Sequence, residues 1–523
     1  MQKTESVNKY LPWAALGVFT LLVLAFKMGG YPLTDNDEAL YSQVAKELLG
    51  RKDWWTLYWH NEPWFIHAPL SMWIQAACFK LFGISEVSAR LNSLIFGFGL
   101  VYLSAAFGAR LFNRRTGIVA GFILASSPIF FATGKLAILD ATLAFFVTLA
   151  IFAFIVAWEK KDWRLYPVFW LSAGFATLNK GLWGLVLPCM VCFLYAITGS
   201  DRKRLLNPVI YISALLWAAV VMPWFIIEAQ RHGALFLEPT LSTNTYARLT
   251  TAVCNHQGPW YFYLVIIAAG FFPWVLLWPK SFIKDRGDAG RLLWLWILPP
   301  LVLFSIAKTK LPNYIVPMLP AFAILIAASV TEAKSRKIQG IATVSIGIAA
   351  AIASFFCLKS ATAANHVLSA INPLWVAGVI LVAYSIAGAA LIKNSRLGPA
   401  VMAVMLGATL CLFPNEYTKV HRYFSPKQTA IDAAMVADGG PVYTINGIRC
   451  EYGLFFYSRP NMVVARDLKE FMKIIPKRAD NYALVVSPND AKILAEHGIK
   501  LKVCFDEKEW LIGKIDRKAS RAR

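Results

Sequence analysis

Long apolar runs dominate the sequence between residues 11 and 414, and about thirteen of them are near the length of a membrane helix. An α-helix of about twenty apolar residues crosses the hydrocarbon core of a bilayer. Runs such as ATLAFFVTLAIFAFIVAW, which begins at Ala141, lack the period-two alternation of the strands in a membrane barrel. Only 16% of the residues are charged, whereas a soluble protein carries about a quarter. The sequence therefore predicts an all-α polytopic membrane protein.

The loops between the runs indicate an orientation. We expect spans near residues 11–29, 90–109, 116–133, 141–158, 165–178, 182–199, 207–228, 259–279, 291–307, 312–330, 338–357, 372–392 and 397–414. If the N-terminus is cytoplasmic, every cytoplasmic loop is basic, as the positive-inside rule requires. These loops cover residues 110–115, 159–164, 201–204, 280–291, 332–337 and 393–396. The odd number of spans then leaves the C-terminal tail outside.

The net charge of +22 is explained by the loops, because most basic residues lie in short loops between apolar runs. No basic stretch interleaves with aromatic residues in the way that single-strand binding requires. We therefore expect membrane lipids and no nucleic acid among the partners.

The tail changes character after residue 414. Strand-like runs such as PVYTIN and YALVVS alternate there with helical ones such as NDAKILAEHG. We predict a transmembrane domain over residues 1–414, including an outer interfacial loop over 30–89, and a small periplasmic α/β domain over 415–523. Cys450 and Cys504 of the tail either pair on the oxidising side of the membrane or remain two buried thiols.

The outer loop opens with the acidic stretch YPLTDNDEALYSQVAKELL, which contains Asp35, Asp37 and Glu38. Apolar residues recur near helical spacing after these acids, and a glycine follows the run, so we expect a capped helix on the outer membrane surface. The question is whether the acids belong to a solvated loop or to a reaction centre.

Other ionisable residues occur at the expected outer ends of spans: Asp140, Lys180, Lys308 and Lys310. Ionisable residues at membrane depth are costly and usually mark function. Lysines bind an anionic phosphate, and a carboxylate beside them can act as a general base on an acceptor hydroxyl. A transporter would also place charges in the membrane, but transporters commonly repeat their halves, and this sequence contains no such repeat. The pattern favours an enzyme acting on a lipid-linked phosphate.

At these residues the chain resembles the GT-C membrane glycosyltransferases, and more narrowly the relatives of the protein O-mannosyltransferases that include the bacterial lipid A aminoarabinose transferases. The order and spacing of several short motifs carry the resemblance over about residues 30–330. These motifs are DEALY (37–41), RKDWWTLYWHNEPWFIHAPLSMW (51–73), LFGISEVSARLNS (81–93), LAILD (136–140), NKG (179–181), RHG (231–233), HQGPW (256–260), FPW (272–274) and TKLPNY (309–314).

The resemblance implies transfer of a sugar from a polyprenyl-phosphate donor to a periplasmic acceptor. Asp37 would be the central carboxylate, with Glu38 beside it and Asp140 as the second acid near the acceptor. The donor phosphate would be surrounded by His67, Lys180, Lys308, Lys310 and Tyr314. Arg231 and His256 would belong to the rim of the site, where some relatives hold a divalent metal.

Three positions depart from the family pattern. His67 stands where relatives use the lysine that grips the donor phosphate, Ile66 replaces an acid that binds metal in some relatives, and Leu40 replaces an arginine. These changes weaken the prediction of a metal, and they leave the sugar and the acceptor open. We predict a glycosyltransferase of the bacterial inner membrane acting on lipid A or another envelope glycan. The alternatives are a protein O-glycosyltransferase of the same class and a non-catalytic lipid or sugar exporter.

Overall fold

The computed structural model describes residues 2–34, 37–240, 250–251, 257–277, 286–332, 336–364, 372–393, 398–420, 427–445, 451–458, 462–475, 481–506 and 510–516. The chain forms two compact units. The first consists of Met1–Met28 and Leu48–Glu416, and the second of Gly29–Glu47 and Tyr417–Arg523. The stretch that follows the first apolar run thus packs with the tail. The predicted domain boundary at residue 415 stays a prediction.

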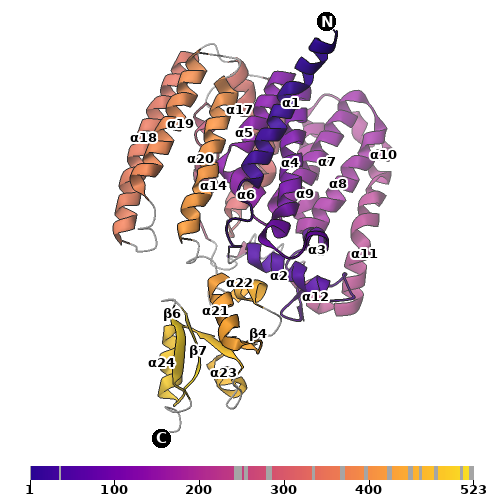
Figure 1. The fold of residues 1–523 in the computed structure, drawn as a ribbon. Coiled ribbons are helices and arrows are strands. Elements are labelled where there is room, and N and C mark those ends of the chain that lie inside the picture. Colours follow the sequence, from indigo (N-terminus) through magenta and orange to yellow (C-terminus); the bar gives the residue numbers. More distant parts are fainter. Residues whose placement is uncertain are drawn as a thin grey trace. The chain divides into compact units, whose positions relative to one another are not determined.

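The first unit is a bundle of helices (Figure 1). Its helices are α1 (Gln2–Ala25), α3 (Leu70–Phe82), α4 (Glu86–Leu111), α5 (Arg114–Ala125), α6 (Pro128–Lys135), α7 (Asp140–Lys160), α8 (Tyr166–Lys180), α9 (Trp183–Thr198), α10 (Pro208–Ile212), α11 (Ala214–His232), α12 (Ala234–Glu238), α14 (Phe262–Gly270), α16 (Gly287–Ile306), α17 (Leu319–Glu332), α18 (Arg336–Ala364), α19 (Pro373–Lys393) and α20 (Gly398–Val420). Short 3-10 turns η1 (Trp163–Leu165), η2 (Arg202–Leu206), η5 (Trp274–Leu277) and η6 (Pro312–Met318) and a hairpin of β1 (Tyr58–Trp59) and β2 (Glu62–Pro63) lie between them.

Seven helices among the described residues are long and apolar enough to cross a membrane, or eight if a bent pair counts as one span. The chain is therefore a multi-pass membrane protein, while the predicted count of thirteen spans stays a prediction. Several predicted spans, including 165–178 and 182–199, correspond to the shorter helices α8 and α9. The predicted span 116–133 is two helices, α5 and α6, bent by 69°. Pro128 causes this break because it lacks an N–H and clashes with a preceding helical turn.

Helix α7 forms much of the core of this unit. It is apolar on all sides, and 72% of its membrane-length window is buried, as expected for a helix surrounded by others. Figure 1 shows α4, α7 and α8 side by side. Close packing of α4 on α5 needs Gly117, where a Cβ would come within 2.1 Å of the carbonyl oxygen of Ala105. Small residues of this kind let membrane helices approach one another closely. Helix α7 in turn packs against both α4 and α8.

The second unit contains a five-stranded mixed sheet with the order β4-β3-β5-β7-β6. Its strands are β3 (Val442–Ile445), β4 (Met462–Ala465), β5 (Ala483–Val486), β6 (Leu501–Asp506) and β7 (Leu511–Ile515), and its helices in the tail are α21 (Lys427–Ala437), α22 (Glu451–Tyr457), α23 (Leu468–Ile474) and α24 (Pro488–Glu496). Strand β3 is parallel to β4 and β5, whereas β7 is antiparallel to β5 and β6. The strands lie at the runs that the sequence predicts.

The central strand β5 explains why helices cover both faces of this sheet. All four of its side chains are buried. Ala483 and Val485 pack in a cluster with residues of α21, while Leu484 and Val486 pack in a second cluster with residues of α23 and α24. Alternate residues of a strand point to opposite faces, so an entirely apolar strand requires cover on both.

Helix α2 (Asp37–Leu49) forms where the sequence predicts a helix and carries Asp37 and Glu38 in its first turn. Lys46 donates to the carbonyl oxygens of Phe456, at 2.6 Å, and Ser458, at 3.3 Å, and the Leu33 N–H donates to the Tyr457 hydroxyl at 2.7 Å. Burial lowers the pKa of Lys46, and the neighbouring Glu47 opposes that shift. These contacts attach α2 to the tail. The predicted position of α2 on the membrane surface stays a prediction. Cys504 is exposed, and Cys450 lies outside the described residues.

Candidate active site

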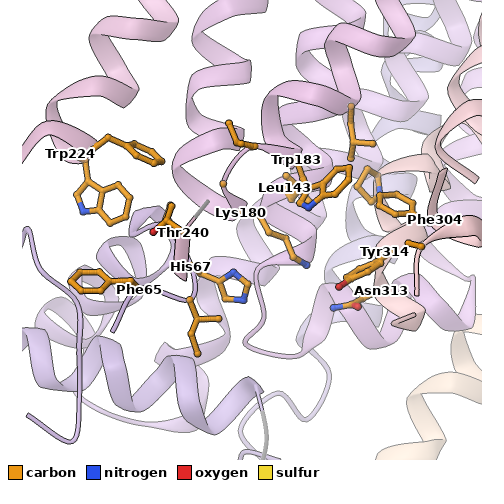
Figure 2. A pocket seen from close by; sticks show the side chains of 18 residues that line it. Phe65, His67, Leu143, Lys180, Trp183, Trp224, Thr240, Phe304, Asn313 and Tyr314 are labelled. Carbon is orange, nitrogen blue, oxygen red and sulfur yellow. The ribbon is translucent and has the colours of Figure 1, made fainter. Parts of the chain in front are cut away.

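A pocket of the first unit contains an apolar wall and a small group of polar side chains (Figure 2). Its empty space is about 970 Å³, including the part that is open to solvent. The lining residues are Phe65, Ile66, His67, Ala68, Leu143, Lys180, Gly181, Leu182, Trp183, Leu187, Trp224, Phe225, Thr240, Phe304, Ala307, Asn313, Tyr314 and Pro317. The pocket suits a ligand with a large apolar part and a compact polar group.

Lys180 and Asp140 form an ion pair beside this pocket. The Lys180 Nζ lies 2.6 Å from Asp140 Oδ1, and the two side chains are 14% and 2% exposed. Asn313 donates from Nδ2 to the other carboxylate oxygen of Asp140 at 2.8 Å. A buried carboxylate needs such partners because desolvation would otherwise disfavour its charge. The structure thus joins Asp140 and Lys180, both predicted site residues, and adds Asn313.

The two charges occupy favourable ends of their helices. Asp140 begins α7, so its carboxylate lies at the positive end of the helix dipole, while Lys180 ends α8 at the negative end. Gly181 ends α8 with a φ of 65°, a conformation that residues with a Cβ rarely adopt. Its N–H donates to the Thr177 carbonyl at 2.8 Å. Local sequence therefore fixes where each charged side chain leaves its helix.

A buried network of hydrogen-bonded polar side chains lies next to the ion pair. Asn179 donates to the carbonyl oxygen of Leu139 at 2.9 Å, and the Ser71 hydroxyl donates to Asn179 Oδ1 at 2.5 Å. Asn92 donates to Ser71, at 3.1 Å, and to Thr142, at 3.2 Å. This network connects α3, α4, α7 and α8. Its members are positioning residues, because they hold the backbone next to Asp140 and Lys180.

Aromatic rings surround the lysine. The Lys180 Nζ lies 5.9 Å from the centroid of the Tyr314 ring, within the range of a cation–π contact. Phe304 packs against Tyr314 and against Trp183, with ring centroids 5.3 and 5.5 Å apart. Figure 2 shows Tyr314 and Asn313 on one side of Lys180 and Phe65 and His67 on the other. Tyr314, a predicted site residue, therefore belongs to the pocket.

His67 also lines the pocket, as the family pattern predicts for this position. Its ring packs edge-on against Trp64, with centroids 5.9 Å apart. The side chain of the preceding Ile66 is 41% exposed and lines the same pocket. The departure from lysine at residue 67 thus lies at the pocket surface, where it can affect a ligand.

Lys308 and Lys310 are not among the residues that line this pocket in the described part of the chain. Lys310 is buried and donates to the carbonyl oxygen of Ala307 at 2.7 Å, whereas Lys308 is exposed. Their predicted contact with a donor phosphate stays a prediction.

Arg231 lies at the end of α11, where it pairs with Asp53. Next to this pair, Thr56 donates to the fully buried Glu228 at 2.9 Å, and His232 Nε2 lies 3.7 Å from the same carboxylate. The ring of His232 packs against Phe65, a residue of the pocket wall. Arg231 is therefore not among the described residues that line the pocket. His256 lies outside the described residues.

Asp37 and Glu38 occupy the first turn of α2 in the second unit. Glu38 is buried and accepts two hydrogen bonds from Thr34, from its N–H at 2.8 Å and its hydroxyl at 3.0 Å. This contact tethers the chain before the helix and gives Glu38 a structural role. Asp37 is half-buried at the first helical position. The catalytic assignment of both acids stays a prediction.

No group of three or more His, Cys, Asp and Glu side chains that could hold a metal ion occurs among the described residues. Ile66, an exposed apolar residue of the pocket, has no atom that binds a metal. The described pocket residues therefore do not fit a metal, and no step is assigned to one.

Sequence reasoning missed several residues of the site. Asn313 occupies the variable position of the TKLPNY motif, so the family pattern gives it no role. The sequence feature that could have indicated a role for Asn313 is its position directly before Tyr314. Trp183 and Phe304 lie within apolar runs, where nothing distinguishes a pocket wall from a lipid-facing or core residue.

The fold is shared with solved structures of other proteins. The structure superposes on ArnT from Cupriavidus metallidurans bound to undecaprenyl phosphate with a TM-score of 0.81 and 22% sequence identity, covering 96% of this chain and 97% of that protein. It also resembles the oligosaccharyltransferase AglB from Archaeoglobus fulgidus, in complex with an inhibitory peptide and a dolichol-phosphate, with a TM-score of 0.53 and 12% identity over 92% of this chain and 70% of AglB. At these identities the likeness defines the fold.

Comparison of the amino-acid sequence also finds similar proteins. A family model described as dolichyl-phosphate-mannose-protein mannosyltransferase matches residues 66–227. An undecaprenyl phosphate-alpha-4-amino-4-deoxy-L-arabinose arabinosyl transferase of Yersinia pestis (strain Pestoides F) is 28% identical over 359 residues, which cover 65% of this chain and 64% of the relative. The Yersinia enterocolitica protein of that name is 27% identical over the same length. The match spans a little under two thirds of these curated relatives. The chain is related to the protein O-mannosyltransferases and the aminoarabinose transferases, so the predicted resemblance is confirmed.

Proposed function

We propose that this protein transfers a sugar from a polyprenyl-phosphate donor to an acceptor at the outer face of the bacterial inner membrane. The observation that carries the proposal is the Lys180–Asp140 ion pair beside a largely apolar pocket, in a chain with the GT-C fold. A polyprenyl-phosphate sugar combines a long apolar chain with one phosphodiester charge. The apolar wall suits the chain, and Lys180 and His67 suit the phosphate.

In the proposed reaction, an acceptor hydroxyl oxygen forms a bond to the anomeric carbon of the donor sugar, and the bond from that carbon to the phosphate oxygen breaks. Asp37 takes the hydroxyl proton as general base, and polyprenyl phosphate leaves with the electron pair of the broken bond. Lys180 and Tyr314 stabilise the negative charge that develops on the leaving phosphate. Asp140 interacts with the acceptor.

We further propose that the acceptor is a lipid or glycan of the envelope such as lipid A, and the relatives named for arabinosyl transfer support the sugar-transfer part of this proposal. We also propose that the N-terminus and the six basic loops are cytoplasmic and that the tail is periplasmic, because positive residues collect in these loops.

The test is an assay of the purified protein with a radiolabelled polyprenyl-phosphate sugar and extracted envelope lipids. Mass spectrometry of envelope lipids and glycans from cells with and without the gene identifies the product. We expect a sugar-modified lipid or glycan that disappears with the gene. Intact donor and an unchanged envelope profile would contradict the proposal and favour the exporter that the sequence leaves as an alternative.

A further inference from the structure

The positive charge of Lys180 is neutralised within the protein by the carboxylate of Asp140. Lys180 is the one side chain with a permanent charge among the described residues that line the pocket, and its amine is paired with Asp140 at 2.6 Å. The carboxylate is almost completely buried, and the lysine is only 14% exposed. In such surroundings an ion pair is screened much less than at a protein surface. A ligand phosphate entering the pocket therefore meets a cation that already has an anion.

Two anions then require the same ammonium group. Lys180 carries one positive charge, so it can pair fully with either the phosphate or Asp140, and the anion that it leaves needs other hydrogen-bond donors. The backbone of Lys180 is held at the last residue of α8, whereas its amine is at the end of a flexible side chain. The amine can turn toward a phosphate in the pocket that it lines.

Asp140 has a second anchor that does not depend on Lys180. Asn313, on η6, donates to its Oδ2 at 2.8 Å, and the start of α7 favours its negative charge. The other amide atom, Asn313 Oδ1, is buried and has no hydrogen-bond partner among the described residues. A buried acceptor without a partner is unusual in a finished structure and indicates a site that is completed by another group.

We propose that Lys180 exchanges partners during the reaction: it binds Asp140 in the empty site and the donor phosphate in the loaded site, while Asn313 holds Asp140 in place. The inference rests on the proposed function and adds an order to it. Donor binding frees one carboxylate oxygen of Asp140, and that oxygen then accepts a hydrogen bond from the acceptor. The donor is therefore bound before the acceptor, and the acceptor contact is completed only when a donor is present.

The exchange predicts that removing the carboxylate improves donor binding. In Asp140→Asn the lysine has no competing anion, so a larger fraction of the protein is competent to bind phosphate. We expect the dissociation constant for a short-chain polyprenyl phosphate in detergent to fall on the order of tenfold. Polyprenol, which lacks the phosphate, should bind equally to both proteins. Lys180→Met should weaken binding of the phosphate, and adding Asp140→Asn to it should restore nothing.

The possible outcomes distinguish failure of the partner exchange from failure of the proposed function. Equal or weaker phosphate binding by folded Asp140→Asn overturns the exchange while leaving the proposed function intact. A wild-type protein that binds polyprenyl phosphate no better than polyprenol overturns both. If Asp140→Asn does not fold, Asn313→Leu decides, because it leaves the ion pair in place. If Lys180 exchanges partners, Asn313→Leu should leave the dissociation constant for the donor unchanged and should reduce kcat roughly tenfold. An unchanged kcat, or a loss confined to donor binding, overturns it.

Discussion

Asn179 donates a hydrogen bond of 2.9 Å to the carbonyl oxygen of Leu139, and each of these residues directly precedes a member of the ion pair, Lys180 and Asp140. The bond thus fixes the end of α8 against the start of α7. Because Asn179 also accepts from Ser71, its side chain cannot turn away without breaking two buried contacts. These contacts of Asn179 fix the backbone position from which the Lys180 side chain extends, and they therefore determine where its amine can lie.

Asn179→Ala should therefore affect both stability and turnover. Loss of a buried hydrogen-bonded amide costs about 1–3 kcal/mol, because Leu139 and Ser71 lose a partner. We expect kcat to fall about tenfold with a small change in donor KM, since the residue positions the pair without touching the ligand. Asn113→Ala is a matched control, because Asn113 caps α5 through its side chain and lies away from the pocket. It should lose about 1 kcal/mol and no activity. Equal turnover in the two variants would contradict the positioning role.

Lys180→Met should destabilise the protein more than the loss of a surface ion pair would. It leaves Asp140 buried with Asn313 as its remaining side-chain partner, and an uncompensated buried charge costs about 3–5 kcal/mol. The double variant Lys180→Met/Asp140→Asn should recover a large part of that loss, because no charge is then left. Thermal unfolding of the four proteins in one detergent measures the coupling. Additive losses would show that the pair contributes no coupling energy.

Asp37→Asn tests the proposed general base. An acid-to-amide change at a half-buried position has a small effect on folding, whereas loss of a positioned base lowers transfer by roughly two or more orders of magnitude. The control is Asp288→Asn, which removes an exposed acid of α16 paired with Arg291. Purified protein and a polyprenyl-linked sugar give the rates. Near-normal turnover of Asp37→Asn would exclude Asp37 as the base.

His67 predicts a pH dependence of donor binding. A free imidazole titrates near pH 6.5, at about which it loses its charge, whereas a lysine stays charged. A phosphate beside the ring favours the charged form, so affinity should be full at low pH and fall as pH rises through the range in which the imidazolium loses its proton. His67→Lys should bind equally well across this range. Titration of donor affinity against pH for both proteins measures the effect. Parallel curves would assign the phosphate to another residue, with Lys180 the next candidate.

Topology can be tested at the C-terminus. A reporter fused after Arg523 should be active only if it works in the periplasm, because the predicted number of spans is odd and the basic loops are cytoplasmic. A second fusion in the basic loop 201–204 is the matched cytoplasmic control. Activity of a cytoplasm-only reporter at Arg523 would mean that the spans were miscounted.

The sequence predicts much of this architecture and part of the site. The positions of Asp140, Lys180 and Tyr314 followed from charge at membrane depth and from ordered motifs, and all three lie at the pocket or its ion pair. Asn313 was missed although it directly precedes Tyr314, and Trp183 could not be predicted because its role arises only when segments far apart in the sequence meet. Hydropathy also could not reveal the bend at Pro128, because both sides of the break are apolar. The structural use of Glu38 depends on Thr34, which composition does not connect to it.

The ion pair also has a consequence for biosynthesis. Asp140 and Lys180 lie at the facing ends of α7 and α8, two consecutive helices that pack against each other as a hairpin. Both charges are therefore made within one stretch of nascent chain, and the ion pair can form before any later helix exists. An isolated lysine or aspartate would oppose insertion of its helix, so the two residues that serve the finished site also allow its helices to reach the membrane.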